Sequence, residues 1–189
     1  MSLTSAIANF RKSATTTVWN PVNASNRELL VLEDWCEDLR RKNAYCLGFI
    51  PAASFRMAAE RNRLLVETQD NEPVGFVLWA KRGRQARIHQ CVVEEEFRRL
   101  RHASRLVAET VNMLSRWKID RLRMRVADDL PANGFWQSIG CRLTTTVPGG
   151  KTWGRTINIY DLPVRNRCKL AEGLITGISE QMRRGLASW

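Results

Sequence analysis

The chain has 189 residues, 44% of them apolar, which is enough for one domain with a full hydrophobic core and too few for two comfortable domains. No apolar run approaches the roughly 18 residues that cross a bilayer, and no basic segment followed by an apolar core stands at the N-terminus, so we expect a cytoplasmic protein without a membrane segment. A formal charge of +11 predicts attraction to polyanions, whereas five cysteines at irregular spacing and two histidines predict neither a disulfide framework nor a metal site.

The first half of the chain predicts two helices and a β-hairpin. Residues 1–24 are polar and are expected to form an N-terminal arm or a first strand. Ser25 and Glu28 form a capping-box pattern ahead of apolar residues at helical spacing, which predicts a helix, and Pro51 opens a second helical segment. Strands are predicted over residues 63–68 and 74–81, joined by a turn at 70–73, and a further strand carries His89.

The second half predicts an alternation of helices and strands. Apolar residues at helical spacing indicate one long helix over 106–117, and a second helix begins near Pro131 and ends at Gly140. Strands are predicted over 122–127, 141–147 and 156–160.

From residue 163 the composition changes to a basic tail. Its apolar residues fall at a spacing of four, which predicts an amphipathic helix. We expect this helix to pack on the domain or to form a homodimer with a second copy, in preference to a separate membrane or nucleic-acid role. The chain therefore divides into an arm (1–24), a main domain (25–162) and a basic C-terminal helix (163–189).

A strand, an acidic turn and an arginine-rich helix start follow one another over residues 88–107. The first amides of a helix have no partner within it, and together with the positive end of the helix dipole they favour an anion in front of them. Arg98, Arg99 and Arg101 add positive charge at the same place. This arrangement predicts a polyphosphate site.

Two segments carry a resemblance to a known family. Residues 98–103, Arg-Arg-Leu-Arg-His-Ala, resemble the acyl-coenzyme-A loop of the GNAT superfamily of N-acetyltransferases, Arg/Gln-x-x-Gly-x-Gly/Ala, with Arg101 in place of the first glycine. Residues 129–141 resemble the later signature of the family, Asn-x-x-Ala-x-x-Phe-Tyr-x-x-x-Gly-Phe, with Asp129 at the asparagine and Trp136 at the tyrosine. The two segments occur in the order that the family requires.

The resemblance implies a fold and an activity. The fold is α/β (α+β): a mixed central sheet, splayed between its fourth and fifth strands and flanked by helices. The activity is the transfer of an acetyl group from acetyl-CoA, or of another acyl group from its acyl-CoA, to an amine acceptor by direct attack.

The resemblance also implies which residues bind the cofactor. The end of the fourth strand would pair with the pantetheine arm, the arginine loop would hold the pyrophosphate, and Asp129 would cap the later helix as well as touch the cofactor. For His102, a place on the buried face of the helix and a place over the cofactor both stay open. The expected cofactor-binding residues are Cys91, Val92, Val93, Arg98, Arg99, Leu100, Arg101, His102, Ala103, Ser104, Asp129, Ala132 and Trp136.

Three residues are candidates for catalysis. Either His89 or Gln90 should face the acceptor side of its strand, and His89 is the candidate base, with a structural hydrogen-bonded histidine as the alternative. Glu94 would hold or deprotonate a cationic acceptor, unless it belongs to a solvated acidic turn. Trp136 stands where the family has the tyrosine that protonates the thiolate, and an indole N–H donates a hydrogen bond without giving up its proton.

The basic charge supports two alternatives to a simple amine acetyltransferase. Between Lys81 and Arg125 there are thirteen Lys or Arg residues against five Asp or Glu. With Arg101 and Trp136 as departures from the pattern, the chain could be a catalytically reduced nucleic-acid-binding or regulatory module, or an enzyme that modifies a nucleic acid. The sequence does not identify the acceptor.

Overall fold

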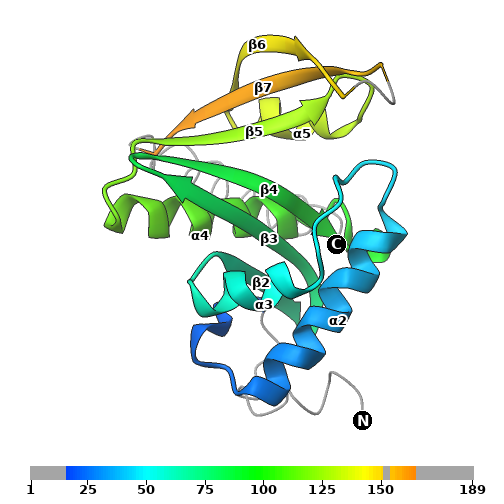
Figure 1. Cartoon of the computed structure of the whole chain (residues 1–189), viewed down its shortest axis with the longest axis vertical. Helices are drawn as coiled ribbons and strands as arrows, with labels where there is room; N and C mark the ends of the chain where they lie inside the picture. The colour runs from blue at the N-terminus through cyan, green and yellow to red at the C-terminus, as the bar shows by residue number, and fades with distance from the viewer. Residues whose placement is uncertain (1–15, 151–153, 165–189) are drawn as a thin grey trace, which may run out of the picture.

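A single mixed sheet of seven strands forms the centre of the computed structural model, which describes residues 16–150 and 154–164 (Figure 1). The strands lie in the order β1-β2-β3-β4-β5-β7-β6, and all neighbours are antiparallel except the parallel pair β4 and β5. The strands are β1 (Thr17–Trp19), β2 (Leu64–Gln69), β3 (Glu72–Arg82), β4 (Gln85–Val93), β5 (Arg121–Ala127), β6 (Arg142–Pro148) and β7 (Thr156–Pro163). The predicted α/β fold with a mixed sheet flanked by helices is confirmed.

The helices begin and end where the sequence provides signals. Ser25 caps the longest helix through the complete capping box with Glu28, and three basic residues occupy the last turn of that helix. The helices are η1 (Pro21–Asn23), α2 (Asn26–Lys42), α3 (Ala53–Glu60), η2 (Glu95–Phe97), α4 (His102–Arg116) and α5 (Ala132–Ser138). None of the helices in the described ranges is long and apolar enough to cross a membrane. The predicted C-terminal helix and its homodimer contact lie outside the described residues.

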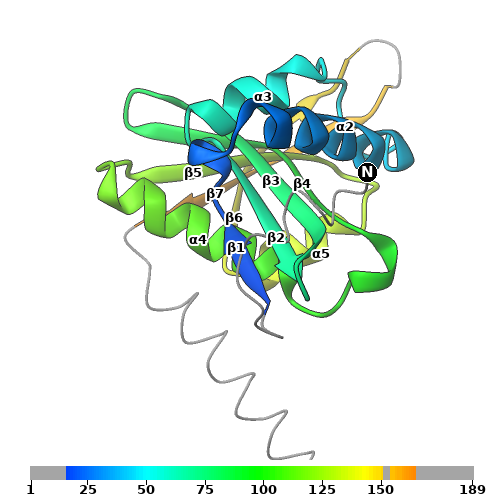
Figure 2. The ribbon, with the colours of Figure 1, turned by 90° about the horizontal axis from the view of Figure 1, so that it is seen from below.

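The helices cover the two faces of the sheet in separate layers (Figure 2). Helices α2 and α3 pack on the first strands through one apolar cluster, which includes Leu32, Phe55 and Phe76. Helices α4 and α5 pack on the opposite face through a second cluster, which includes Leu106 and Trp136. Burial of these apolar side chains is the main source of the stability of both layers.

Close contact between β3 and β4 requires a glycine at position 75. A Cβ atom on Gly75 would lie 2.8 Å from the carbonyl oxygen of Val92 and 3.0 Å from Cγ2 of Val93. The strand that leads into the arginine loop is therefore held against its neighbour at a distance that no other residue permits.

We predict that Gly75→Ala lowers the free energy of unfolding by about 1–3 kcal/mol, because the added methyl group forces β3 and β4 apart. Urea denaturation measures this loss. Gly134→Ala is the matched control: a Cβ on Gly134 in α5 meets nothing within 4 Å, so this change should be neutral or should stabilise by up to about 1 kcal/mol. Equal midpoints for Gly75→Ala and the wild type would contradict the close packing of these strands.

Candidate active site

Strands β4 and β5 separate part of the way along their length. Their pairing covers only Gln85–Arg87 of β4 and Arg121–Arg123 of β5, although β4 continues to Val93 and β5 to Ala127. In Figure 1 the two strands lie together at one end and diverge toward the other. An extended ligand with amide groups can add to such a strand edge as a further strand would. The divergence expected between the fourth and fifth strands lies between β4 and β5, and it exposes the edge of β4 that includes residues 91–93.

The loop after β4 takes a left-handed backbone without a glycine. Both Arg99 and Arg101 have φ of 67°. Such a conformation costs a non-glycine residue about 1–3 kcal/mol. Arg101 is the N-cap residue of α4 and makes no side-chain cap hydrogen bond, so its side chain does not occupy the first amides of the helix. The backbone therefore follows the course that a glycine would give it, and the N-terminus of α4 keeps the properties of an anion site.

The arginines of this loop have different surroundings. Arg98 points back to the domain: its Nε donates to the Val93 carbonyl oxygen at 3.2 Å, and its Nη2 donates to Asn43 Oδ1 at 2.8 Å. Asn43 is buried at the end of α2, so Arg98 fastens the loop to that helix. Arg99 and Arg101 are exposed at the surface, together with Leu100. Ala103 and Ser104, which follow in the first turn of α4, are half-buried.

A buried charged cluster holds the N-terminus of α4 on the sheet. His102 is 1% exposed and Glu67 of β2 is fully buried. Glu67 Oε1 lies 3.1 Å from His102 Nδ1 and accepts from Arg105 Nε at 2.6 Å. Burial raises the pKa of Glu67, and Arg105 opposes that effect. Of the two places left open for His102, the structure shows the buried one. Neither Glu67 nor Arg105 was among the residues expected from the sequence.

A pocket that contains His89 lies on the face of β4 that is turned toward α3. The pocket lies between α3 and the strands β3 and β4 and has a volume of about 290 Å³. Burial and, to a smaller extent, the positive charge of Arg87 lower the pKa of His89, so its imidazole is neutral near pH 7 and can accept a proton. The pocket is lined by Ile50, Ser54, Met57, Ala58, Arg61, Arg63, Leu78, Trp79, Ala80 and His89.

A bulge in β4 changes which residues reach this face. Leu78 of β3 pairs with Gln90 and Trp79 pairs with Ile88, which leaves His89 as the extra residue. Gln90 is buried, and its Nε2 donates to the Gly48 carbonyl oxygen at 2.7 Å, in the connection between α2 and α3. Strand alternation predicted that only one of His89 and Gln90 would face the acceptor side. Because of the bulge, both side chains lie on the α3 side of the strand.

Two other catalytic candidates lie away from His89. Glu94 is five residues further along the chain, which corresponds to about 16 Å of extended strand, and its carboxylate is 3.8 Å from Lys42 Nζ. Trp136 is 6% exposed and packs in the apolar cluster on the α4 side of the sheet, with its ring centroid 4.9 Å from that of Phe135. The structure therefore does not bring His89, Glu94 and Trp136 together as one catalytic group.

The loop between β5 and α5 is fixed by Asn133, which was not among the residues expected from the sequence. Asn133 Nδ2 donates to the carbonyl oxygens of Ala127 and Leu130, and its Oδ1 accepts from Asn158 and from the Tyr160 hydroxyl. The prediction that Asp129 caps α5 is wrong, because this helix begins without a side-chain cap. Instead the exposed Asp129 forms an ion pair, and Ala132 is exposed at the start of α5.

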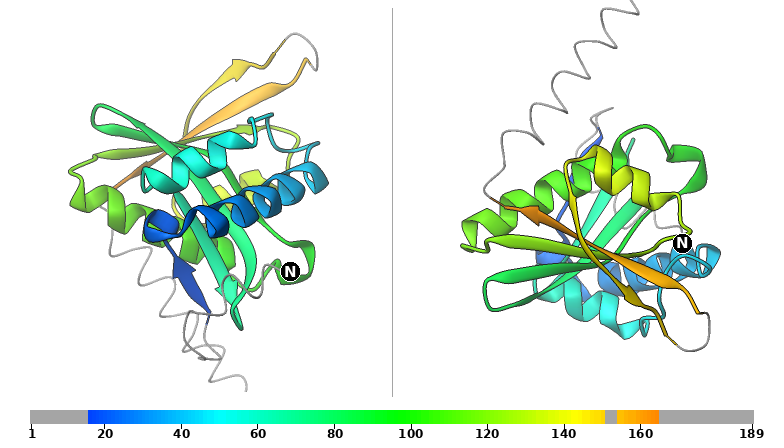
Figure 3. Two further views of the ribbon diagram at one scale, coloured as in Figure 1. Left: turned by 60° about the horizontal axis from the view of Figure 1, so that its bottom comes forward. Right: turned by 90° about the horizontal axis from the view of Figure 1, so that it is seen from above.

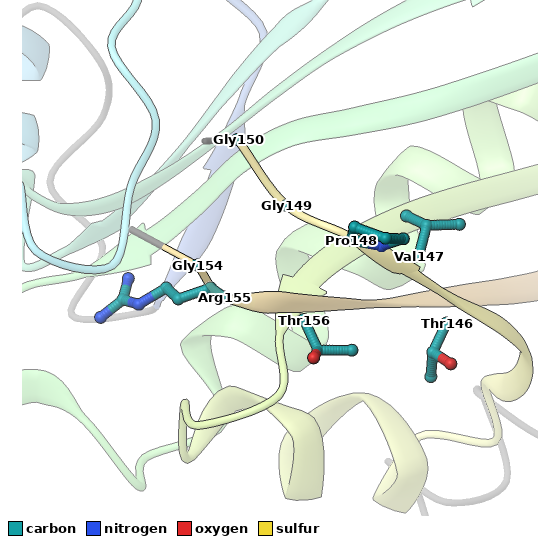
Figure 4. Close-up of a pocket in the computed structure, with 8 residues that line it drawn as sticks. All are labelled: Thr146, Val147, Pro148, Gly149, Gly150, Gly154, Arg155 and Thr156. Carbon is teal, nitrogen blue, oxygen red and sulfur yellow. The ribbon is translucent and has the colours of Figure 1, made fainter. Parts of the chain in front are cut away.

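Arg155 joins three segments near the open end of the divergence. In Figure 4 its side chain extends away from the hairpin of β6 and β7, which itself surrounds a small pocket lined by residues 146–150 and 154–156. The Nη1 of Arg155 donates to the Tyr45 carbonyl oxygen at 3.0 Å, and its Nη2 lies 3.1 Å from Asp129 Oδ2. The hairpin is thereby attached to the α2–α3 connection and to the loop before α5.

Comparisons with known proteins agree with this architecture. The sequence model of the Acetyltransferase (GNAT) family matches residues 28–141. No curated protein matches the chain.

Several solved structures share the fold at low sequence identity. Ard1 from Thermoplasma volcanium superposes with a TM-score of 0.62 at 19% identity, covering 80% of this chain and 98% of its own. The ribosomal-protein-S18-alanine N-acetyltransferase from Escherichia coli gives 0.61 at 14% identity, covering 79% and 94%. The yncA protein from Salmonella typhimurium, solved with its cofactor acetyl-CoA, gives 0.64 at 12% identity, covering 80% and 95%.

We predict that Arg105→Gln lowers the free energy of unfolding by about 2–3 kcal/mol, because it leaves Glu67 buried without its opposite charge. Thermal and urea denaturation measure the change. Arg116→Gln in the same helix removes an exposed ion pair with Glu109 and should cost about 0.5 kcal/mol or less. The double variant Glu67→Gln/Arg105→Gln should recover part of the loss. Equal destabilisation by Arg105→Gln and Arg116→Gln would contradict the role of the buried cluster.

We also predict that His89 titrates below its ordinary value of 6.5 and that Arg87→Gln raises its pKa, because a nearby positive charge is removed. The chain has only two histidines, so NMR of the imidazole groups resolves them, and a His89→Gln spectrum assigns the signal. A wild-type midpoint above 6.5, or an unchanged midpoint in Arg87→Gln, would contradict the environment described for His89.

Proposed function

The chain belongs to the GNAT family of acetyltransferases, and we propose that it transfers the acyl group of acetyl-CoA, or of a related acyl-CoA, to an amine that binds in the pocket beside His89. One observation carries the proposal. The parallel strands β4 and β5 separate and leave the edge of β4 without pairing to β5. Strand β4 then leads into the arginine loop and into the N-terminus of α4, which has no side-chain cap. These features suit the two parts of an acyl-CoA, an arm with amide groups and a polyphosphate.

The residues present fit the cofactor of the family. We assign the pantetheine arm to the edge of β4 at Cys91, Val92 and Val93, where β5 has already separated. We assign the pyrophosphate to the first amides of α4, with positive charge from Arg99 and Arg101. Arg98 supports this site indirectly through its hydrogen bonds to Val93 and Asn43.

Direct attack by the amine is favoured over an acyl-enzyme route. Burial raises the pKa of the Cys91 thiol to about 12, so this cysteine of the proposed cofactor strand is protonated and a poor nucleophile near pH 7. The bound acyl-CoA would supply a thioester whose carbonyl carbon forms the new C–N bond as its C–S bond breaks. His89 would accept the proton that the amine loses, and its neutral imidazole suits that role.

Glu94 and Trp136 receive supporting roles in this proposal. Glu94 lies near Lys42 and about 16 Å along the strand from His89, so we assign it to the turn after β4. Trp136 is buried against Phe135, and we assign it to the apolar core on the α4 side of the sheet. The thiolate then takes its proton from solvent.

A catalytically reduced domain is less well supported. That alternative depends on Arg101, which replaces a glycine, and on Trp136, which replaces a tyrosine. The left-handed φ of Arg101 weakens the first argument, because the loop keeps the conformation of a glycine in spite of the substitution. Loss of the tyrosine removes one proton donor and leaves the base and the cofactor site in place.

Calorimetric titration with acetyl-CoA tests the proposal. We predict roughly one-to-one binding, and we predict that Arg99→Glu/Arg101→Glu weakens it at least about tenfold, because two positive charges beside the pyrophosphate become negative. Arg82→Glu, an exposed change at the end of β3, where Arg82 pairs with Gln85 far from the loop, is the control and should change the affinity little. Unchanged affinity in the loop variant would contradict the assigned site.

A further inference from the structure

The half of the sheet formed by β5, β7 and β6 has one face that no helix of the described residues covers. Helices α2 and α3 lie over β2 to β4, whereas β7 and β6 extend beyond them (Figure 3). The other face of the same strands packs on α4 and α5 through Leu122, Met124 and Val126. Side chains alternate along a strand, so Arg121, Arg123 and Arg125 belong to the uncovered face.

The strand register places these arginines beside others. Arg87 of β4 pairs with Arg123, Arg123 pairs with Asp161 of β7, and Asp161 pairs with Arg142 of β6. Residues directly opposite each other share a face, so the row crosses four strands and extends about 14 Å at a strand spacing of about 4.8 Å. We call Arg87, Arg121, Arg123, Arg125 and Arg142 the arginine face.

The arginine face carries much more positive than negative charge. Asp161 accepts hydrogen bonds from Arg123 at 2.8 and 2.9 Å and lies 3.4 Å from Arg121. Within the described ranges, Arg87, Arg125 and Arg142 form no ion pair. The positive charge of Arg125 also acts on Arg87, whose pKa is lowered first by burial and then by that charge. Two guanidinium groups that repel each other without a counter-charge favour an anionic partner.

We propose that the arginine face binds the phosphate backbone of a nucleic acid. A row of about 14 Å is longer than a single phosphate or carboxylate group, which favours an extended polyanion. The guanidinium fork matches phosphate oxygens in a bidentate manner. The row begins at Arg87, about 7 Å along the strand from His89, so the bound nucleic acid reaches the pocket of the proposed acceptor. Any role of the nucleic acid as acceptor rests on the proposed function, whereas the binding itself does not.

Fluorescence anisotropy tests the binding with three labelled 20-nucleotide probes: single-stranded RNA, single-stranded DNA and duplex DNA. The slope of log affinity against log salt reports how many phosphates the protein neutralises. For Arg87→Gln/Arg125→Gln we expect binding that is at least about tenfold weaker and a slope that is reduced by about two. The reason is that each substitution removes one arginine that would neutralise a phosphate. Arg116→Gln/Lys118→Gln removes the same charge from the α4 side of the molecule and should leave the slope unchanged. Circular dichroism establishes that both variants are folded.

Three results would overturn the proposal. The first is no binding of any probe at 50 mM salt. The second is an equal loss in both variants, which would mean that only the net charge matters. The third is binding of a polyglutamate peptide with the same affinity and the same dependence on Arg87 and Arg125, which would indicate an acidic protein partner instead.

Acetyl-CoA titration of the same variants separates this proposal from the proposed function. Intact binding of acetyl-CoA without binding of any probe would reject the nucleic-acid surface and leave the acetyltransferase in place. Binding of the probes without binding of acetyl-CoA would support the arginine face and reject the cofactor site. We expect Arg87→Gln/Arg125→Gln to bind acetyl-CoA as the wild type does, because neither residue belongs to the loop of α4.

Discussion

The early end of hydrogen bonding between β4 and β5 is the constraint on which the rest of the site depends. After Arg87 and Arg123 the two strands no longer pair, so the remaining backbone edge of β4 faces β5 without ladder bonds to it. A ligand with amide groups can add to such a strand edge as a further strand would. The two faces of β4 lie toward different helices: Ile88 packs on the α4 side, and His89 lies in the pocket on the α3 side.

Tertiary contacts hold the loop that follows this edge. Two residues of the loop have the left-handed φ that usually requires glycine, and this strain persists because the surroundings determine the conformation. Arg98 fastens the start of the loop to the end of α2, and the cluster of Glu67, His102 and Arg105 fastens the first turn of α4 to β2. Buried charge is a poor source of stability, but here Glu67 Oε1 has two partners on α4, which fix the position of the first turn of that helix on β2.

Local sequence patterns predicted the helices and strands and the order in which the segments of the site follow one another. The remaining features depend on pairing between segments that are distant in the sequence. The capping box of Ser25 and the apolar spacing of α4 are visible in a short window, as is the arginine loop. The bulge at His89 depends on the register between β3 and β4, and the cluster at Glu67 joins residues 35 positions apart. The arginine face requires four strands to be placed side by side. None of these follows from the period of one segment.

Titration of acetyl-CoA into the ¹⁵N-labelled protein, followed at the backbone amides by NMR, tests whether an acyl-CoA occupies the divergence. If it does, the largest shifts will be those of Cys91 and Val93 on the edge of β4 and of Ala103 and Ser104 in the first turn of α4. Amides of the paired segment Gln85–Arg87 will change little. Shifts concentrated on the α3 side around His89 and Arg63, with none in the first turn of α4, would contradict a cofactor site between β4 and β5.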